Sequence, residues 1–309
     1  MRHLYYTPIL VILNKKVSFN QKEGFFMKNT KTNQEKWLNK IEDTLKIGGR
    51  SKRTFENYKS HIKRFLEFYD ENTDFKKFNE DDILNYLKTN YLDFNRSENT
   101  LNMAECAIYF LFSICFDKCL NKKKLPSCKL RKRMPSIITK ADFIKIFNSE
   151  PNLKHKCWLL LAFCSGLRVS EIASLKVENL NSKNHQILIQ NGKRKRDRYT
   201  ILPNISIKFL GLYCKTNNIK SGYVFPGTNS SFMNEKSIIN YFSVVKEEYH
   251  LNENITFHSL RHSFATYFLM NGGSLLTLQS MLGHTNLNTT TIYLHLSQNF
   301  NQLEGIKYV

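Results

Sequence analysis

Apolar residues recur at helical spacing through the first part of the chain. They form four stripes: Trp37, Leu38, Ile41 and Leu45; Tyr58, Ile62, Phe65, Leu66 and Tyr69; Ile83, Leu84 and Leu87; and a run from Leu101 to Leu120. Because residues three and four apart share one face of a helix, each stripe predicts an amphipathic helix. We therefore expect a compact all-helical domain over residues 28–120. It lacks Gly-rich loops and paired catalytic groups, which favours a binding role.

A basic segment interrupts this pattern at residues 121–135. Lysine and arginine crowd there around two prolines, at Lys122, Lys123, Lys124, Pro126, Lys129, Arg131, Lys132, Arg133 and Pro135. This composition predicts an extended connector between two domains. Such a strap can lie along DNA phosphates, although a run of charge is more often a solvated segment.

The second domain, residues 136–309, is helical with one interruption. Residues 185–190 and 199–202 are rich in β-branched and other apolar residues, and the turn dipeptide Asn191-Gly192 lies between them. This pattern predicts a β-hairpin with a basic tip. The predicted fold class is therefore mainly α in two domains: an all-helical N-terminal domain, and a C-terminal domain of mixed α with a small β-sheet.

The first 27 residues differ from the rest. The apolar run from Leu4 to Leu13 contains Pro8 and is shorter than the ~20 residues that span a bilayer. It also lacks a small-residue cleavage site. Since Met27 opens an ordinary helical pattern, we expect residues 1–27 to be a leader that is disordered or arises from a mis-called start.

The composition points toward an anionic partner. Lysine and arginine exceed aspartate and glutamate by 46 − 26 = 20, and the pI is near 9.6. This balance favours nucleic acid or an acidic membrane surface, although a generally lysine-rich surface explains it as well. The seven cysteines include no C-x-x-C pair, which argues against a disulfide framework or a cysteine zinc site and fits a reducing cytoplasm.

Arg168 lies at a predicted junction between two helices. An apolar helix stops at Gly166 and another begins near Ser170. An arginine beside so apolar a segment needs an anionic partner. For this fragment alone, the preferred interpretation is an internal pair with Glu171.

The segment from Thr256 to Met270 carries a second cationic group. Its core stripe is Phe257, Leu260, Phe264 and Phe268. This spacing places His258 and Arg261 together on the adjoining face. His258 and His262 are four apart, as in a zinc helix, but the first histidine is not followed by the glutamate of such sites, and Arg261 would repel a metal. We therefore expect no metal.

Four motifs in order resemble the tyrosine recombinase (phage integrase) family, and the Xer-like members most. They are Ser165-Gly166-Leu167-Arg168 followed by Glu171; His258-Ser259-Leu260-Arg261-His262; Leu282-Gly283-His284; and Tyr293, nine residues after His284. The resemblance covers residues 136–309. The preceding helical domain resembles the family's core-binding, SAM-like domain by position and size only.

The resemblance implies a catalytic set at Arg168, Lys193, His258, Arg261, His284 and Tyr293, with Lys195 on the same hairpin tip as an alternative to Lys193. The residue chemistry agrees with it. Two guanidiniums can fork onto the phosphoryl oxygens of a transition state. A phenol of pKa about 10 needs a base and a positive field, which His258 and the arginines supply.

For the remaining members, Lys193 would protonate the leaving 5′-oxygen and His284 would hydrogen-bond the phosphate. No metal or other cofactor is required. Taken alone, however, Tyr293 fits a half-buried helix tyrosine, and His284 fits a helix-capping residue.

The resemblance thus implies a site-specific DNA recombinase or integrase acting through a 3′-phosphotyrosyl intermediate. Its expected partner is double-stranded DNA with inverted half-sites. The expected assembly is a homo-oligomer, a dimer on each site and a tetramer in the synapse, with or without a paralogous recombinase. We expect a cytoplasmic protein without membrane attachment; chromosome-dimer resolution and mobile-element movement both fit.

Two alternatives stay open. A type IB topoisomerase would use similar chemistry on one duplex but would not join two sites. A non-catalytic DNA-binding protein of the same fold would form no covalent adduct at Tyr293.

Overall fold

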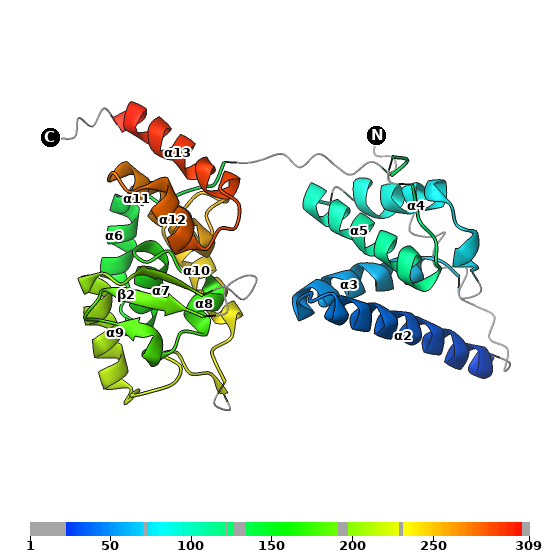
Figure 1. Ribbon diagram of the computed structural model, residues 1–309, viewed down its shortest axis with the longest axis horizontal. Helices are drawn as coiled ribbons and strands as arrows, with labels where there is room; N and C mark the ends of the chain where they lie inside the picture. Colours follow the sequence, from blue (N-terminus) through cyan, green and yellow to red (C-terminus); the bar gives the residue numbers. More distant parts are fainter. Residues whose placement is uncertain are drawn as a thin grey trace, which may run out of the picture. The chain divides into compact units, whose positions relative to one another are not determined.

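The computed structural model describes residues 23–70, 73–94, 96–121, 123–125, 134–190, 197–228 and 231–304 (Figure 1). The chain forms two compact units, Met1–Lys132 and Arg133–Val309. Three predicted features fall wholly or largely outside the described residues. They are the leader over residues 1–22, the linker over 126–133, and the hairpin tip over 191–196 with Lys193 and Lys195.

The first unit is all-helical among its described residues. Its elements are α2 (Glu23–Ile47), α3 (Lys52–Phe68), η1 (Phe75–Lys77), α4 (Glu80–Leu87), η2 (Lys88–Leu92) and α5 (Glu98–Cys115). Side-chain caps fix where these helices begin. The Ser51 side chain accepts from the Thr54 amide, and Asn79 forms a capping box with Asp82 at the start of α4.

The core of this unit is aromatic. The ring of Phe65 lies within about 6 Å of several others, which come from η1, α4, α5 and the residues directly after α3 and η1: Tyr69, Phe75, Phe78, Tyr86 and Phe112. The four predicted stripes supply this core. Two details were wrong. Leu84 is 37% exposed, and α5 ends at Cys115 rather than continuing to Leu120 because Asp117 adopts a left-handed φ of 52°.

The second unit combines helices with a small sheet. Its helices are α6 (Lys140–Ser149), α7 (Leu153–Phe163), α8 (Val169–Ala173), η3 (Val177–Asn179), α9 (Asn204–Thr216), α10 (Glu235–Glu248), α11 (Phe257–Met270), α12 (Leu275–Leu282) and α13 (Asn288–Glu304). The strands are β1 (Leu180–Asn181), β2 (Gln186–Ile189) and β3 (Arg198–Ile201). The predicted fold class, mainly α with a small sheet in the second domain, is confirmed.

The predicted hairpin is present as the antiparallel pair of β2 and β3, with Ile187 opposite Thr200. A two-residue strand, β1, pairs with β2 on the side away from β3. This third strand was not predicted. Strand alternation buries Ile187 and Ile189 of β2 and, from β3, Arg198 and Thr200. An arginine therefore points from the sheet into the protein.

The last three helices lie together at one end of this unit (Figure 1). They share a small apolar cluster, separate from the main core: Phe264, Ala265, Leu278, Met281, Leu282, Tyr293 and Leu296. The candidate nucleophile is thus part of a packed core.

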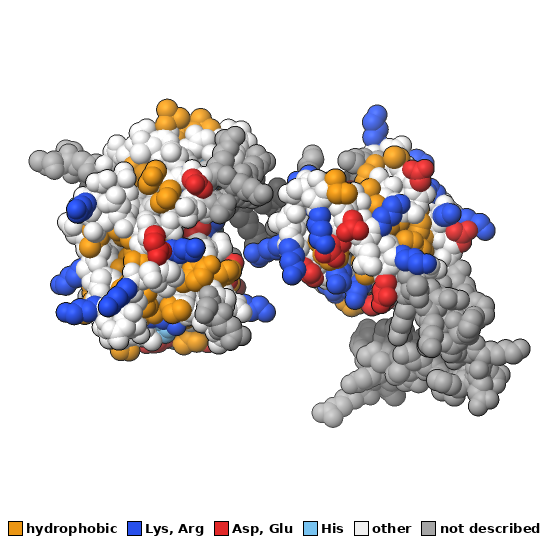
Figure 2. All heavy atoms as spheres, turned by 60° about the horizontal axis from the view of Figure 1, so that its bottom comes forward, with side chains coloured by type: hydrophobic (Ala, Val, Ile, Leu, Met, Phe, Trp, Pro, Cys, Tyr) orange, Lys and Arg blue, Asp and Glu red, His pale blue; other side chains and the backbone are white. Residues whose placement is uncertain are grey.

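On the face seen in Figure 2, lysine and arginine side chains are spread over both units and form no single patch. Within the described part of the chain, no helix is both long and apolar enough to cross a membrane.

Candidate active site

Arg168 lies where the sequence predicted it, at the junction of two helices. α7 ends at Phe163, Gly166 turns the chain with a φ of 68°, and Arg168 is the N-cap of α8. Its backbone amide donates to Oε2 of Glu171 at 2.8 Å, and its Nη1 donates to Oε1 at 2.7 Å. The internal pair with Glu171 is therefore present.

Glu171 is the centre of a cluster of arginines. Nη2 of Arg198 lies 2.8 Å from Oε2 of Glu171, and Nη1 of Arg261 lies 3.6 Å from the same oxygen. Burial acts to raise the pKa of Glu171. The hydrogen bond from Arg198 and the charges of the three arginines outweigh burial and lower the pKa to about 2. The carboxylate is therefore ionised at neutral pH.

The end of α12 anchors the same guanidiniums. The carbonyl of Leu282 accepts from Nη2 of Arg261 at 2.7 Å and from Nη2 of Arg168 at 3.1 Å. The Met281 carbonyl accepts from Nε of Arg198 at 2.7 Å. The last carbonyls of a helix carry partial negative charge, so this helix end favours cations. Arg168 and Arg261 thus lie side by side, although they are 93 positions apart in sequence (261 − 168).

Gly166 completes the support. Its carbonyl accepts from Nη1 of Arg261. A Cβ at position 166 would lie 2.4 Å from Cδ1 of Phe264, and the positive φ disfavours side chains as well. Only glycine fits between the arginine and the Phe264 ring.

The described cluster has an excess of positive charge. Three guanidiniums face one carboxylate, so its net charge is 3 − 1 = +2. Burial lowers the pKa of Arg261 to about 9, which still leaves its guanidinium protonated at neutral pH. Arg261 and Arg198 are buried, whereas the side chain of Arg168 is 24% exposed. A partly buried site with this charge suits an anion.

Tyr293 lies beside this cluster on α13 and is only 3% exposed. Its Oη is 2.8 Å from Nδ1 of His262. Burial raises the pKa of Tyr293, and the charges of Arg261 and Arg168 partly offset that rise. The phenol is therefore protonated at neutral pH unless a base takes the proton.

Three histidines surround the tyrosine and the arginines. The His284 ring lies 6.4 Å from that of Tyr293 in a stacked orientation, and its Nδ1 pairs with Oγ1 of Thr290 at 2.9 Å. The rings of His258 and His262 are 4.6 Å apart and nearly perpendicular. Burial and the neighbouring cationic groups lower the pKa of His284 to about 4 and that of His262 to about 3. Desolvation and Arg261 also lower the pKa of His258, although its side chain is exposed.

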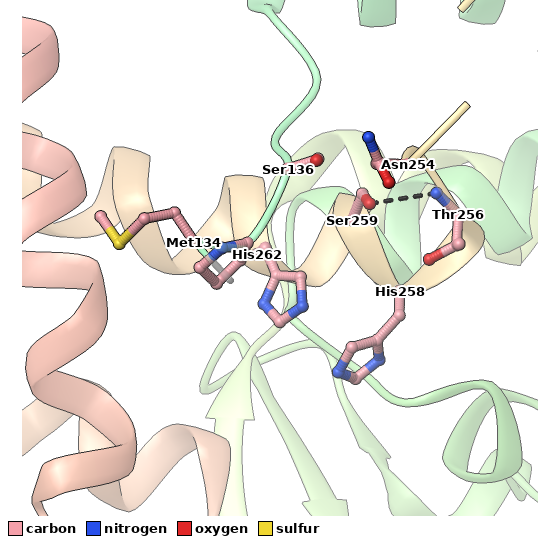
Figure 3. Close-up of a pocket in the computed structure, with 8 residues that line it drawn as sticks. Met134, Ser136, Asn254, Thr256, His258, Ser259 and His262 are labelled. Carbon is pink, nitrogen blue, oxygen red and sulfur yellow. Dashed lines mark hydrogen bonds between the residues drawn. The ribbon is translucent and has the colours of Figure 1, made fainter. Parts of the chain in front are cut away.

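His258 and His262 open into a pocket of about 460 Å³ (Figure 3). Both imidazoles point from α11 to the same side. The remaining lining comes from the segment before α6, the loop before α11 and α11 itself: Met134, Pro135, Ser136, Asn254, Thr256 and Ser259. The pocket connects the two histidines with solvent.

The structure brings together five of the six predicted site residues: Arg168, His258, Arg261, His284 and Tyr293. Lys193 lies outside the described residues. Sequence reasoning missed the roles of Arg198 and His262. The position of Arg198 directly before the predicted strand, two residues from Thr200, was a usable signal. For His262 the signal was its position next to Arg261.

Among the described residues, no group of three or more His, Cys, Asp or Glu side chains could hold a metal ion. The expectation that the site works without a cofactor stays a prediction.

Comparison with known proteins establishes the family. Residues 136–299 match the phage integrase family, and residues 37–122 match the phage integrase N-terminal SAM-like domain. Tyrosine recombinase XerA of Pyrococcus horikoshii is 31% identical over 261 residues, covering 83% of this chain and 87% of the relative. A tyrosine recombinase of Thermosipho africanus is 25% identical over 260 residues, covering 80% and 90%. The chain belongs to the phage integrase family and is a tyrosine recombinase similar to the Xer proteins.

Solved structures agree on the fold. A lambda integrase dimer bound to a COC′ core site matches with a TM-score of 0.67 and 18% identity, covering 84% of this chain and 94% of the other. XerH bound to palindromic difH substrate matches with a TM-score of 0.65 and 21% identity, covering 82% and 79%. The all-helical first domain and the mixed second domain are those of this fold.

Proposed function

We propose that the chain recombines specific DNA sites by transferring a DNA strand to Tyr293 and back. The observation that carries this proposal is the juxtaposition of a buried tyrosine hydroxyl with a cluster of net charge +2. A phosphodiester is the anion that a tyrosine can attack, and its transition state carries more negative charge than its ground state. A preorganised positive site therefore stabilises the transition state more than the ground state.

Arg168 and Arg261 are the proposed clamp on the phosphoryl oxygens. Each guanidinium has five N–H donors, and their shared anchor at the Leu282 carbonyl leaves other donors available to a phosphate. Arg198, whose donors are directed at Glu171 and the Met281 carbonyl, is a positioning residue. Loss of one clamp arginine should lower cleavage by about 10²–10³-fold, as for loss of other preorganised donors.

The attack of Tyr293 forms a bond between Oη and phosphorus and releases the 5′-oxygen, leaving a 3′-phosphotyrosyl intermediate. Lys193 is the proposed proton donor to the leaving oxygen, with Lys195 as the alternative. His284 is proposed to hydrogen-bond the phosphate. Because the phosphotyrosyl bond conserves the energy of the broken bond, religation needs no nucleotide and no metal.

The proposed partner is double-stranded DNA with inverted half-sites, bound by a dimer on each site and a tetramer in the synapse. The neighbouring structures support DNA binding and assembly on DNA, since one is a dimer on a core site and the other is bound to a palindromic substrate. The net charge of +20 favours the same partner. Pairing with a paralogous recombinase and a cytoplasmic location remain predictions.

The test starts from a pool of nicked duplexes with random inserts, incubated with the protein in EDTA. Covalent complexes are recovered under denaturing conditions and sequenced, which yields the site. Two plasmids carrying that site are then incubated with the protein. We expect DNA covalently attached at its 3′ end and joining of the plasmids. Relaxation of supercoils without joining would indicate a topoisomerase, and absence of any adduct would indicate a non-catalytic binding protein.

A further inference from the structure

The hydroxyl of Tyr293 is hydrogen-bonded to a histidine outside the predicted catalytic set. Of the three histidines, the one hydrogen-bonded to the nucleophile is His262, with Nδ1 2.8 Å from Oη of Tyr293. The ring centroids of this pair lie 5.6 Å apart. The sequence analysis predicted that His258 activates Tyr293. In the structure, His258 is exposed and packs against His262.

We propose that His262 is the catalytic base that takes the proton of Tyr293 during strand cleavage. This inference rests on the proposed function, because it requires Tyr293 to be the nucleophile. It places the base on the residue directly after Arg261, so that one turn of α11 supplies both a clamp arginine and the proton acceptor.

The geometry favours His262 over the other two histidines. Nδ1 of His284 is engaged by Thr290 at 2.9 Å, and the centroid of its ring lies 6.4 Å from that of the Tyr293 ring. His258 is exposed and lines the pocket, and its ring packs against that of His262. Only the His262 contact has the hydrogen-bond length that a general base requires.

The surroundings keep His262 neutral, which a base must be. Groups that face it or its immediate neighbours come from every element around it: His258 and Arg261 on α11, Arg168 and Glu171 at α8, His284 after α12, and Tyr293 on α13. Burial and the cationic groups lower the pKa of His262 to about 3, so the ring is uncharged at neutral pH. In the required tautomer, Nε2 carries the proton and Nδ1 accepts one.

The step balances without a further reactant. The O–H bond of Tyr293 breaks and its proton passes to Nδ1 of His262, while Oη bonds to phosphorus. The bond from phosphorus to the 5′-oxygen breaks, and that oxygen takes a proton from the proposed lysine donor. Religation reverses each transfer, so His262 returns its proton to Tyr293.

The pocket provides a route for proton exchange. His262 contacts Tyr293 through Nδ1 and also lines the pocket that opens beside Met134, Ser136 and Thr256 (Figure 3). An imidazolium formed during cleavage can therefore exchange its other proton with water while Tyr293 stays buried.

Substitution of His262 by asparagine distinguishes a general base from a residue that only accepts a hydrogen bond. Its Oδ1 is as many bonds from the backbone as Nδ1 of histidine, so His262→Asn can keep the hydrogen bond to Tyr293 but cannot take the proton. His262→Ala removes both. The control is His295→Ala, an exposed histidine on the helix that carries Tyr293.

The experiment measures single-turnover adduct formation on a nicked duplex carrying the selected site, between pH 6 and 9. DNA affinity and thermal melting are measured on the same proteins. We expect both His262 variants to bind normally and to form adduct about 10²–10⁴-fold more slowly than wild type. Their rates should climb with pH by about tenfold per unit, because the unassisted phenol, whose pKa is raised by burial, must ionise first. Free imidazole should partly restore His262→Ala but not His262→Asn, whose side chain fills the space.

If His262→Asn cleaves at the wild-type rate with the wild-type pH profile, the inference is wrong and the proposed function stays intact. Faster cleavage in either variant would also overturn it, since the hydrogen bond would then restrain the tyrosine. Absence of an adduct in wild type would overturn the proposed function itself.

Discussion

Nη2 of Arg198 lies 2.8 Å from Oε2 of Glu171, and both side chains are less than a tenth exposed. This ion pair links the sheet to the start of α8. Arg261 and Arg168 pair with the same carboxylate. The geometry of the clamp arginines therefore depends on one buried glutamate.

Replacing Glu171 with glutamine should destabilise the protein severely. Three guanidiniums would stay in place without their counter-charge, and breaking a buried pair in this way costs about 3–5 kcal/mol. The free energy of unfolding, from denaturant titration of wild type and variant, checks this. The exposed Glu178→Gln is the control and should lose far less. Equal losses in the two variants would remove Glu171 from the centre of the cluster.

The same residue predicts a pH dependence. The pKa of Glu171 is about 2 in the folded protein, below the ~4.3 of an unfolded glutamate. Its contribution to stability is therefore fully present above the unfolded pKa and is lost as the pH falls through the folded value. Between pH 5 and pH 2, wild type should lose more stability than Glu171→Gln. Parallel pH curves for the two proteins would contradict this.

Gly166→Ala should distort the site as well as the fold. The positive φ alone costs about 1–2 kcal/mol, and the clash with the Phe264 ring adds about 1–3 kcal/mol. Gly222→Ala is a matched control, because Gly222 has a φ of 77° and open space around its Cβ position. Melting of both variants separates strain from clash. Adduct formation should fall only in Gly166→Ala, whose carbonyl holds Arg261.

The pattern along the chain predicted the helices, the hairpin and the stripe that buries Phe257, Leu260 and Phe264, because these depend on local periodicity. The motifs predicted most of the residues that meet at the site. The pattern could not predict which side chains pair, since those contacts join distant segments. His262 is the clearest case: its partner is 31 positions away on another helix. The four-residue spacing of His262 from His258 suggested a metal ligand, and no local pattern indicates its contact with Tyr293.

Arg198 shows a second limit. The sequence pattern predicts the strand from residue 199 onward, which leaves Arg198 outside it. Because a strand alternates its faces, extending it by one residue reverses that interpretation and places Arg198 in the interior.

Lys193 stays a prediction of the sequence. A DNA substrate with sulfur in place of the bridging 5′-oxygen has a leaving group that needs no proton. Lys193→Ala should therefore cleave ordinary DNA slowly and the sulfur-substituted DNA at nearly the wild-type rate. If Lys195→Ala shows that rescue and Lys193→Ala does not, the donor is two positions further along.

Covalent attachment at Tyr293 is the central claim, and comparison of two phenylalanine variants tests it most directly. Tyr293→Phe removes the proposed nucleophile, and Tyr267→Phe removes another tyrosine hydroxyl of the same unit, which donates to the Ile138 carbonyl. Each protein is incubated with a nicked duplex labelled at the 5′ end of the cleaved strand, the end that stays on the protein-bound fragment, and resolved on a denaturing gel. We predict that Tyr293→Phe binds the DNA as wild type does and forms no adduct, whereas Tyr267→Phe forms it normally. An adduct that persists in Tyr293→Phe would place the nucleophile on another residue and contradict the account.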